Sequence, residues 1–346
     1  MTAFASDNYA GAHPAVMAQV AKANEAGHVV AYGGDPVTAE ATELVREHLG
    51  SDAEVFFVWG GTAANVLCLE SLAPLHHQAV VCAESAHIYV DEGGAPERLL
   101  SRKLLPVATP DGKLTPELVA SRLIRFGDWH AVQPKVISIT QSTELGTRYT
   151  HAEIRALADV AHERGMLLHL DGARIMNAAA GMGCSLREAT RDLGVDALSL
   201  GLTKNGGLGA EAVVLWDAAH AEGFQWRRKS AMQLASKHRY LAAQAIGLLQ
   251  DDLWRRSALH ANAMAQRLAA GVREVPRVRV TQEVQANSVF AVLPVPLRDA
   301  LYAEGFIFYV WDEGAGEVRW MCSWDTTEAD VDAFVDAVAR HGHAQA

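Results

Sequence analysis

Cysteine is scarce in this sequence, and nothing in its spacing indicates a metal or redox site. The four cysteines, Cys68, Cys82, Cys184 and Cys322, form no CxxC pair and have no histidine at a metal-ligand spacing. Such a pattern argues against a structural zinc site or a redox dithiol. Cys68 and Cys82 stand in apolar runs, where a small buried thiol is the ordinary interpretation. We therefore predict no bound metal.

Basic clusters, long apolar runs and a targeting segment are also missing. The 30 lysines and arginines are outnumbered by 41 acidic residues, for a net charge of −11. A nucleic-acid surface needs clustered basic side chains, so no such partner is expected. No apolar run is long enough to span a membrane, and residues 1–7 lack the features of a secretory signal. We expect no membrane partner and a cytoplasmic location.

Short apolar runs alternate with helical stretches over the first two thirds of the chain. Helices are expected at 62–72 and 150–164. Strands are expected at 55–59, 79–83, 135–140, 166–170, 197–200 and 211–216. This alternation is typical of an α/β fold whose mostly parallel sheet is covered by helices on both faces.

The last third of the sequence has a different pattern. Residues 225–274 are almost entirely helical in character. Strands are expected beyond Pro276 at 278–280, 288–293, 306–311 and 317–322, and a final helix at 328–340. At 346 residues the chain can hold one large domain and a smaller one. We predict an N-terminal arm and a large domain at 1–240 and a small α+β domain at 241–346.

A lysine and an aspartate stand at the ends of two expected strands. Lys204 follows the strand at 197–200 in a glycine-rich segment, and Asp171 ends the strand at 166–170. In open α/β sheets, ligands bind beyond the carboxyl ends of the strands. Pyridoxal 5′-phosphate needs a lysine amine that holds its aldehyde as a Schiff base and a carboxylate that keeps its pyridine nitrogen protonated. Taken singly, Lys204 could be a solvated loop residue and Asp171 a cap.

The glycine pair Gly60-Gly61 joins the expected strand at 55–59 to a helix. Free N–H groups at a helix start can bind a phosphate, and the Thr62 hydroxyl can add a bond. The segment is neither a GxGxxG motif nor a P-loop, which disfavours dinucleotides and nucleoside triphosphates. The alternative is an ordinary glycine turn with Thr62 as the helix N-cap.

Three further side chains could serve the same ligand. His87 could stack on a cofactor ring or carry a proton, although a single histidine is more often structural. Arg319, in an apolar strand, needs an anionic partner, which is either a bound carboxylate or a structural ion pair. Arg174 follows Asp171 by three residues. The phosphate loop, histidine, aspartate, lysine and late arginine occur in one consistent order, which strengthens each weak signal.

With these residues assembled, the chain resembles the low-specificity L-threonine aldolases, in the β-eliminating-lyase branch of the fold-type I PLP enzymes. The Tyr-Gly-x-Asp-Pro element at 32–36 and the Asp-Gly-Ala-Arg element at 171–174 are fairly specific to this group. The likeness covers nearly the whole chain and also includes residues 6–9, 60–65, 87–89, 199–207 and Arg319. It implies a transferase-like large domain with a mostly parallel seven-stranded sheet and a small C-terminal α+β domain.

The resemblance implies a role for each cofactor-binding residue. Lys204 would be the Schiff-base residue, Asp171 the partner of the ring nitrogen, and His87 the stacking residue. The phosphate would be held by Gly61 and Thr62, with Gly60 beside them.

The resemblance also implies how substrate and subunits meet. Ser6, Arg174 and Arg319 would receive the substrate carboxylate, with Arg174 also beside the cofactor. Active sites in the family lie at subunit interfaces, so Tyr32 and the Arg228-Lys229 pair would serve the site of the neighbouring subunit, Tyr32 with the substrate and Arg228-Lys229 with the cofactor. Homotetramers built as dimers of dimers are expected.

The implied reaction is the reversible cleavage of an L-β-hydroxy-α-amino acid to glycine and an aldehyde. Candidate substrates are L-threonine, L-allo-threonine and L-phenylserine. Many family members have Glu-Asn-Thr-His where this chain has residues 141–144, so Glu144 replaces a histidine near the substrate hydroxyl. The base is His87 or Glu144, directly or through water. The alternatives are a β-eliminating lyase acting on aromatic or sulfur amino acids, an aminotransferase, and a binding protein without cofactor.

Overall fold

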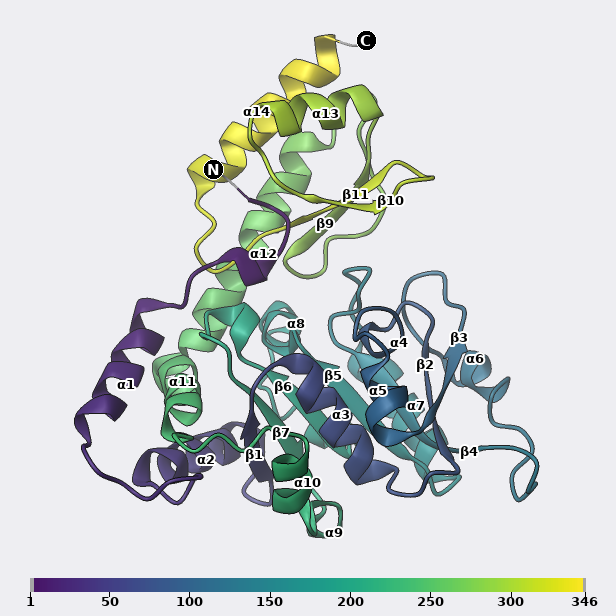
Figure 1. Ribbon diagram of the computed structural model, residues 1–346. Coiled ribbons are helices and arrows are strands. Elements are labelled where there is room, and N and C mark those ends of the chain that lie inside the picture. Colours follow the sequence, from purple (N-terminus) through teal and green to yellow (C-terminus); the bar gives the residue numbers. More distant parts are fainter. Residues whose placement is uncertain (1–2, 345–346) are drawn as a thin grey trace.

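A seven-stranded sheet forms the centre of the larger of two lobes in the computed structural model, which describes residues 3–344 (Figure 1). Its strand order is β1-β7-β6-β5-β4-β2-β3, and only β7 runs antiparallel to its neighbours. The strands are β1 (Glu54–Val58), β2 (Gln78–Ala83), β3 (Lys103–Val107), β4 (Gln133–Thr140), β5 (Leu167–Gly172), β6 (Ala197–Gly201) and β7 (Glu211–Leu215). The predicted mostly parallel sheet is therefore confirmed.

One strand of this sheet, β3, was not predicted. Its sequence, Lys-Leu-Leu-Pro-Val, contains Pro106, which weakens a strand signal. Proline lacks the N–H that a central strand donates, so it is tolerated mainly at sheet edges. Accordingly, β3 pairs with β2 alone and forms an edge of the sheet.

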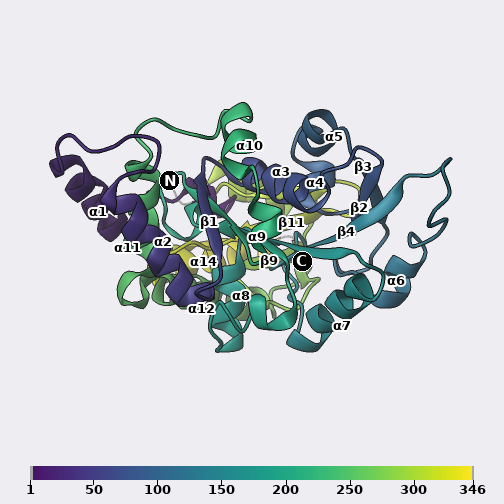
Figure 2. The ribbon, with the colours of Figure 1, turned by 90° about the horizontal axis from the view of Figure 1, so that it is seen from below.

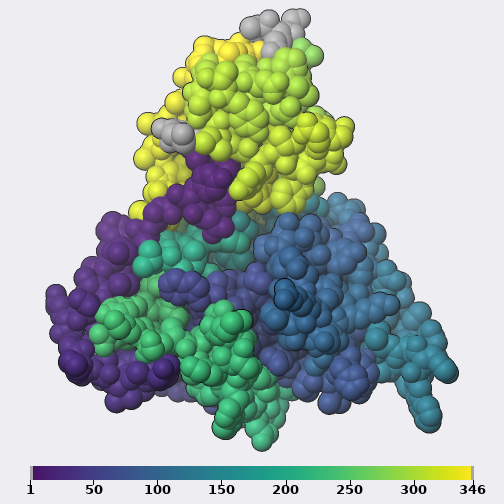
Figure 3. Space-filling view, in the orientation of Figure 1, coloured from purple at the N-terminus to yellow at the C-terminus, as the bar shows by residue number. Residues whose placement is uncertain are grey.

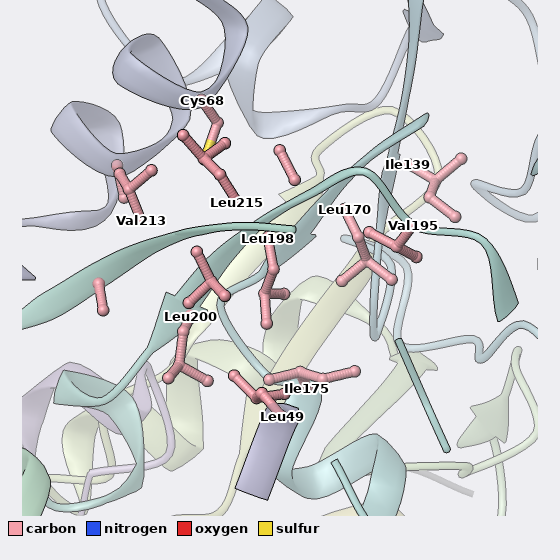
Figure 4. Packing of buried hydrophobic residues seen from close by; sticks show 14 of the residues in the cluster. Leu49, Cys68, Ile139, Leu170, Ile175, Val195, Leu198, Leu200, Val213 and Leu215 are labelled. Atoms are coloured by element: carbon pink, nitrogen blue, oxygen red, sulfur yellow. The ribbon is translucent and has the colours of Figure 1, made fainter. Parts of the chain in front are cut away.

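Helices cover both faces of the large sheet (Figure 2). Helix α3 (Gly61–Leu72) packs against β5, β6 and β7, and α7 (His151–His162) packs against β4 and β5. Leucine and valine side chains from β5, β6 and β7 fill the space between these layers (Figure 4). The other helices of this lobe are α1 (Pro14–Glu25), α2 (Pro36–Leu49), α4 (His87–Val90), α5 (Ala95–Leu100), α6 (Pro116–Ala120), α8 (Ile175–Met182), α9 (Ala218–Ala221), α10 (Phe224–Ser230) and α11 (Arg239–Leu249).

The smaller lobe has its own sheet and core. Its four-stranded antiparallel sheet has the order β10-β11-β9-β8, and Trp320 and Phe334 lie at the centre of a separate apolar cluster. The long helix α12 (Leu253–Val272) contributes Trp254 to the first core and Leu268 to the second. The remaining elements are β8 (Arg279–Val280), β9 (Ser288–Val292), α13 (Val295–Ala303), β10 (Tyr309–Asp312), β11 (Glu317–Met321) and α14 (Glu328–Ala344). The predicted boundary between the large and small domains, at residues 240 and 241, remains a prediction.

The N-terminal arm crosses between the two lobes (Figure 3). The Phe4 N–H donates to the Ile307 carbonyl at 2.7 Å, and the Phe4 carbonyl accepts from the Met321 N–H at 2.7 Å. The Phe4 side chain is buried in the core of the smaller lobe. These contacts fix the arm, so the short 3₁₀ helix that follows, Asp7–Tyr9, lies at the junction of the lobes.

Two expectations from the sequence, on the burial of cysteines and on membrane-spanning segments, can be compared with the structure of residues 3–344. All four cysteines are free and buried, as expected of Cys68 and Cys82, and burial raises the pKa of the Cys68 thiol to about 12. Within that range no helix combines the length and apolarity that crossing a membrane requires.

Candidate active site

The carboxyl edge of the large sheet carries a cavity of about 320 Å³. Asp171 stands near the end of β5, Lys204 follows β6, and the glycine pair follows β1. Because β5 and β6 are parallel neighbours, Asp171 lies opposite Ser199, shortly before the Lys204 turn. The sequence-predicted residues that line the cavity are Gly60, Gly61, Thr62, His87, Asp171 and Lys204.

The start of α3 forms one wall of this cavity. Gly60 is the N-cap with φ = +84°, and no side chain caps the helix. The alternative in which Thr62 is the N-cap is therefore wrong, since Thr62 lies inside the helix. A Cβ on Gly60 or Gly61 would meet no atom within 4 Å, so both backbones face open space. Uncapped N–H groups beside open space suit a phosphate.

Asp171 is held at the cavity floor by two donors. Its side chain is buried, Oδ2 accepts from Nδ2 of Asn65 at 2.7 Å, and Oδ1 accepts from the Ala173 N–H at 3.0 Å. The two bonds fix the direction of the carboxylate. A carboxylate fixed in this way suits the protonated nitrogen of a pyridine ring.

Glu92 and Asn65 connect Asp171 to His87. Oε1 of the buried Glu92 accepts from Nδ2 of Asn65 at 2.8 Å and lies 2.9 Å from Nδ1 of His87. The hydrogen bond to Glu92 raises the pKa of His87 against the opposing effect of burial. The Nε2 atom of His87 has no hydrogen-bond partner among residues 3–344. His87 thus has the orientation of a base held by a carboxylate.

Replacing Glu92 by glutamine tests this pairing. The neutral amide removes the charge that raises the pKa of His87, so His87 should lose its proton at a lower pH. If neutral His87 is the required base, the acid limb of the kcat/KM profile moves to lower pH in Glu92→Gln. An unmoved acid limb, measured on the same substrate, would separate His87 from the proton transfer.

Lys204 lies in a short 3₁₀ turn, Thr203–Asn205, with its side chain in the cavity. Burial lowers the pKa of its amine, and the neighbouring Arg174 lowers it further. The amine makes no hydrogen bond and no ion pair within the described part of the chain. A lowered pKa favours the neutral amine, which is the form that attacks an aldehyde.

Arg174, predicted to bind the substrate carboxylate, already holds a carboxylate of the protein. Its Nε and Nη2 donate to the two oxygens of Asp7 at 2.7 and 2.9 Å. Burial works to raise the pKa of Asp7, but Arg174 outweighs it and the pKa is lowered. Nη1 of Arg174 has no hydrogen-bond partner among residues 3–344, so it is free to bind a ligand. Ser6, on the same arm, caps the turn through its Oγ, which accepts from the Asn8 N–H at 3.2 Å.

Arg319, on β11, has no carboxylate partner in residues 3–344. Its guanidinium carbon lies 5.4 Å from the Tyr309 ring centroid and 4.9 Å from that of Trp311, and Nη2 donates to the Ala5 carbonyl at 3.2 Å. The alternative of a structural ion pair is therefore wrong. Burial, together with Arg174, lowers the pKa of Arg319 to about 10, because the buried guanidinium lacks a compensating charge, which a bound carboxylate would supply.

Glu144 lines a smaller cavity of about 50 Å³ that shares Gly61, His87, Asp171, Ala173 and Lys204 with the main one. Its Oε1 accepts from the His87 N–H at 2.9 Å and from Oγ1 of Thr140 at 2.8 Å. Burial raises the pKa of Glu144. A carboxyl group with a raised pKa beside His87 can hold or pass a proton near neutral pH.

Three predicted residues, Tyr32, Arg228 and Lys229, lie away from the cavity of their own chain. Tyr32 is exposed, and the Lys229 amine lies 5.0 Å from the centroid of its ring. Arg228 is buried, with Nη1 donating to the Phe57 carbonyl at 3.1 Å, and burial lowers its pKa to about 10. A role for these residues in a neighbouring subunit remains a prediction.

The cavity brings together what one cofactor requires. It offers an unpartnered lysine amine, a fixed carboxylate and an uncapped helix start, which match the aldehyde, ring nitrogen and phosphate of pyridoxal 5′-phosphate. The fold and this cavity together define a pyridoxal 5′-phosphate-dependent enzyme of fold type I.

Within that class, the chain belongs to the β-eliminating lyase family, whose family model matches residues 3–294. It is 45% identical over 329 residues to the low specificity L-threonine aldolase of a Pseudomonas species, covering 95% of this chain and 94% of that one. It is 46% identical to the enzyme of that name from Pseudomonas aeruginosa, covering 93% of each chain. The solved structure of Leishmania major threonine aldolase matches with a TM-score of 0.92 at 30% identity, covering 99% of this chain and 100% of that one.

Proposed function

We propose that this protein catalyses the reversible cleavage of L-β-hydroxy-α-amino acids to glycine and an aldehyde, with L-threonine, L-allo-threonine and L-phenylserine as candidate substrates. The observation that carries the proposal is the free Lys204 amine in one cavity with the fixed Asp171 carboxylate. The name shared by the Pseudomonas relatives, at 45% identity and above, supports this reaction over others of the family.

Each part of the cofactor has a residue assigned to it. Lys204 would hold the aldehyde, Asp171 the ring nitrogen and His87 the face of the ring, while Gly60, Gly61 and Thr62 would hold the phosphate. When bound, pyridoxal 5′-phosphate supplies an electron sink for the electron pair that is left at Cα when a bond there breaks.

Two arginines would orient the substrate. Arg319 would bind its carboxylate against Tyr309 and Trp311, and Nη1 of Arg174 would bind from the other side. Asp7 keeps Arg174 in place for this contact. Holding the carboxylate would fix the orientation of the substrate in the cavity, and with it the bond that breaks, which for this reaction is Cα–Cβ.

His87 would take the proton of the β-hydroxyl group at Nε2 as Cα–Cβ opens. Nδ1 is engaged by Glu92, so Nε2 is the ring atom left for substrate. The carboxylate also stabilises the imidazolium that forms. In the reverse reaction the same atom returns the proton to the aldehyde oxygen.

Glu144 would assist this proton transfer. Its replacement by alanine distinguishes a role in Cα–Cβ cleavage from a role in cofactor binding. Glu144→Ala should slow Cα–Cβ cleavage by about 10²-fold, the scale of one general acid–base group. The affinity for pyridoxal 5′-phosphate should change little, because Glu144 bonds to the backbone N–H of His87 and to Thr140, and not to the ring of His87. Single-turnover aldehyde release measures the first quantity and cofactor titration the second; unchanged release would remove Glu144 from the mechanism.

The assembly is proposed to be a cytoplasmic homotetramer, a dimer of dimers whose active sites lie at subunit interfaces. Tyr32 and Lys229 lie together on the surface, outside the cavity of their own chain. The exposed Trp59 and Leu208 line the cavity mouth, where a second subunit would cover them. Light scattering should give a mass of four chains; a monomer that retains full activity would contradict this arrangement.

One assay tests the proposed reaction. The protein, loaded with pyridoxal 5′-phosphate, is incubated with each of the three candidate substrates, and glycine is measured together with acetaldehyde or benzaldehyde. We expect equal amounts of glycine and aldehyde from at least one substrate. The family match favours one alternative, β-elimination from aromatic or sulfur amino acids. Ammonia and keto acid from those amino acids, without any aldehyde, would support that alternative instead.

A further inference from the structure

Glu211, a single acidic residue that belongs to no sequence motif, lies between the two turns that form the cavity. It is the first residue of β7, and its register partners are Val58 at the end of β1 and Gly201 at the end of β6. The Gly60 turn follows β1, and the Lys204 turn follows β6. Glu211 is buried, and its side chain lines the cavity.

The Glu211 carboxylate binds the chain just before Lys204. Its Oε2 accepts from the Leu202 N–H at 2.7 Å. The next residue, Thr203, donates its hydroxyl to the Ala210 carbonyl, directly before Glu211, at 3.3 Å. On the far side of the lysine, Oε1 of Gln244 accepts from the Leu208 N–H at 2.8 Å and from the following N–H. The lysine turn is therefore held at both ends by side chains from other elements.

Charge also links Glu211 to Lys204. Burial raises the pKa of Glu211 to about 7, and Lys204 is among the groups that oppose this rise. In return, Glu211 favours the charged form of the Lys204 amine. The charged or titratable groups that act on Lys204 are Arg174, Asp7, Asp171, Glu211 and His87. Of the three carboxylates, Asp7 is paired with Arg174, and Asp171 is assigned to the ring nitrogen. Glu211 forms no ion pair within residues 3–344, and Lys204 is the cation that acts on it there.

We propose that Glu211 is a positioning residue for Lys204, which fixes the turn before the lysine by its hydrogen bond to the Leu202 N–H and sets how tightly the amine holds its proton. This role presupposes the role proposed for Lys204. In the capture step, the neutral amine nitrogen forms a double bond to the aldehyde carbon. The aldehyde oxygen leaves as water with the two amine hydrogens.

The test compares capture of pyridoxal 5′-phosphate with binding of pyridoxine 5′-phosphate, which lacks the aldehyde. Cofactor-free protein is titrated with each compound, and the visible absorption of the lysine adduct is followed as a function of pH. The variants are Glu211→Ala, Glu211→Gln, Lys204→Ala and, as a matched control, Glu70→Gln. Glu70 is a partly buried glutamate of α3 that does not line the cavity.

In Glu211→Ala, capture should weaken by about tenfold or more, the scale of one lost charge-assisted hydrogen bond. Affinity for pyridoxine 5′-phosphate should stay within about twofold, because its contacts lie elsewhere in the cavity. Glu211→Gln retains an acceptor oxygen but loses the charge, so the Lys204 amine should hold its proton less tightly. Its capture should therefore persist to lower pH than in the wild type, and Glu70→Gln should match the wild type.

Two results would overturn the role of Glu211. One is wild-type capture by Glu211→Ala, and the other is an equal loss of both compounds, which indicates a general structural defect. If Glu211→Ala does not fold, the test rests on the lowest pH at which Glu211→Gln still captures pyridoxal 5′-phosphate. A value equal to that of the wild type counts against the proposal. An adduct that still forms in Lys204→Ala would instead contradict the proposed role of the lysine.

Discussion

Replacing Lys204 by alanine should abolish the release of glycine and aldehyde. Loss of the covalent attachment point that we propose for the cofactor is expected to reduce kcat by about 10⁴-fold or more, the scale seen when a covalent catalytic residue is removed. The variant should also lack the visible absorption of the lysine adduct, while the phosphate site at the start of α3 remains intact. Glycine formation and the absorption spectrum measure the two effects.

A surface lysine provides the control for this experiment. Lys103 lies exposed on the edge strand β3, outside the cavity, so Lys103→Ala should match the wild type in both measurements. If Lys204→Ala retained activity within tenfold of the wild type, Lys204 could not be the residue that carries the cofactor.

The second large effect is expected for Asp171→Asn. An amide fits the same space but carries no charge to keep the ring nitrogen protonated, so the cofactor becomes a weaker electron sink. In addition, the asparagine would present an NH₂ group to Asn65 or to Ala173, both of which now donate to the carboxylate. We expect kcat to fall by about 10²- to 10³-fold, the scale of losing one preorganised electrostatic contact.

Cofactor attachment should survive this change, because Lys204 is untouched, and the adduct spectrum checks it. Asp196→Asn is the matched control: Asp196 lies just before β6, bonds to His162 and to the Leu168 N–H, and does not line the cavity. Activity of Asp171→Asn equal to that of Asp196→Asn would contradict the role of Asp171.

Much of the fold and part of the site follow from local sequence patterns. Apolar runs identify six of the seven large-sheet strands, because buried parallel strands are apolar throughout. The parallel order then brings Asp171 and the Lys204 turn to one edge, since carboxyl ends of parallel strands meet there. Strand β3 is not predicted from an apolar run, because it is an edge strand and can therefore contain a proline, Pro106.

The contacts that tune the site depend on distant parts of the chain. Asp7 pairs with Arg174 across 167 positions, and no local pattern indicates that an acid near the N-terminus neutralises this arginine. Glu92 and Glu211 are single acidic residues whose importance comes from burial beside His87 and the Lys204 turn. Burial of a charged group is a tertiary property, and its partners become visible only when the strands are assembled.

The most direct test of the account is chemical trapping at the lysine. Protein loaded with pyridoxal 5′-phosphate is reduced with borohydride, digested and mapped by mass spectrometry. We predict one cofactor-derived label per chain, on Lys204. A label on a different lysine, or none on a protein that still releases glycine and aldehyde, would contradict it.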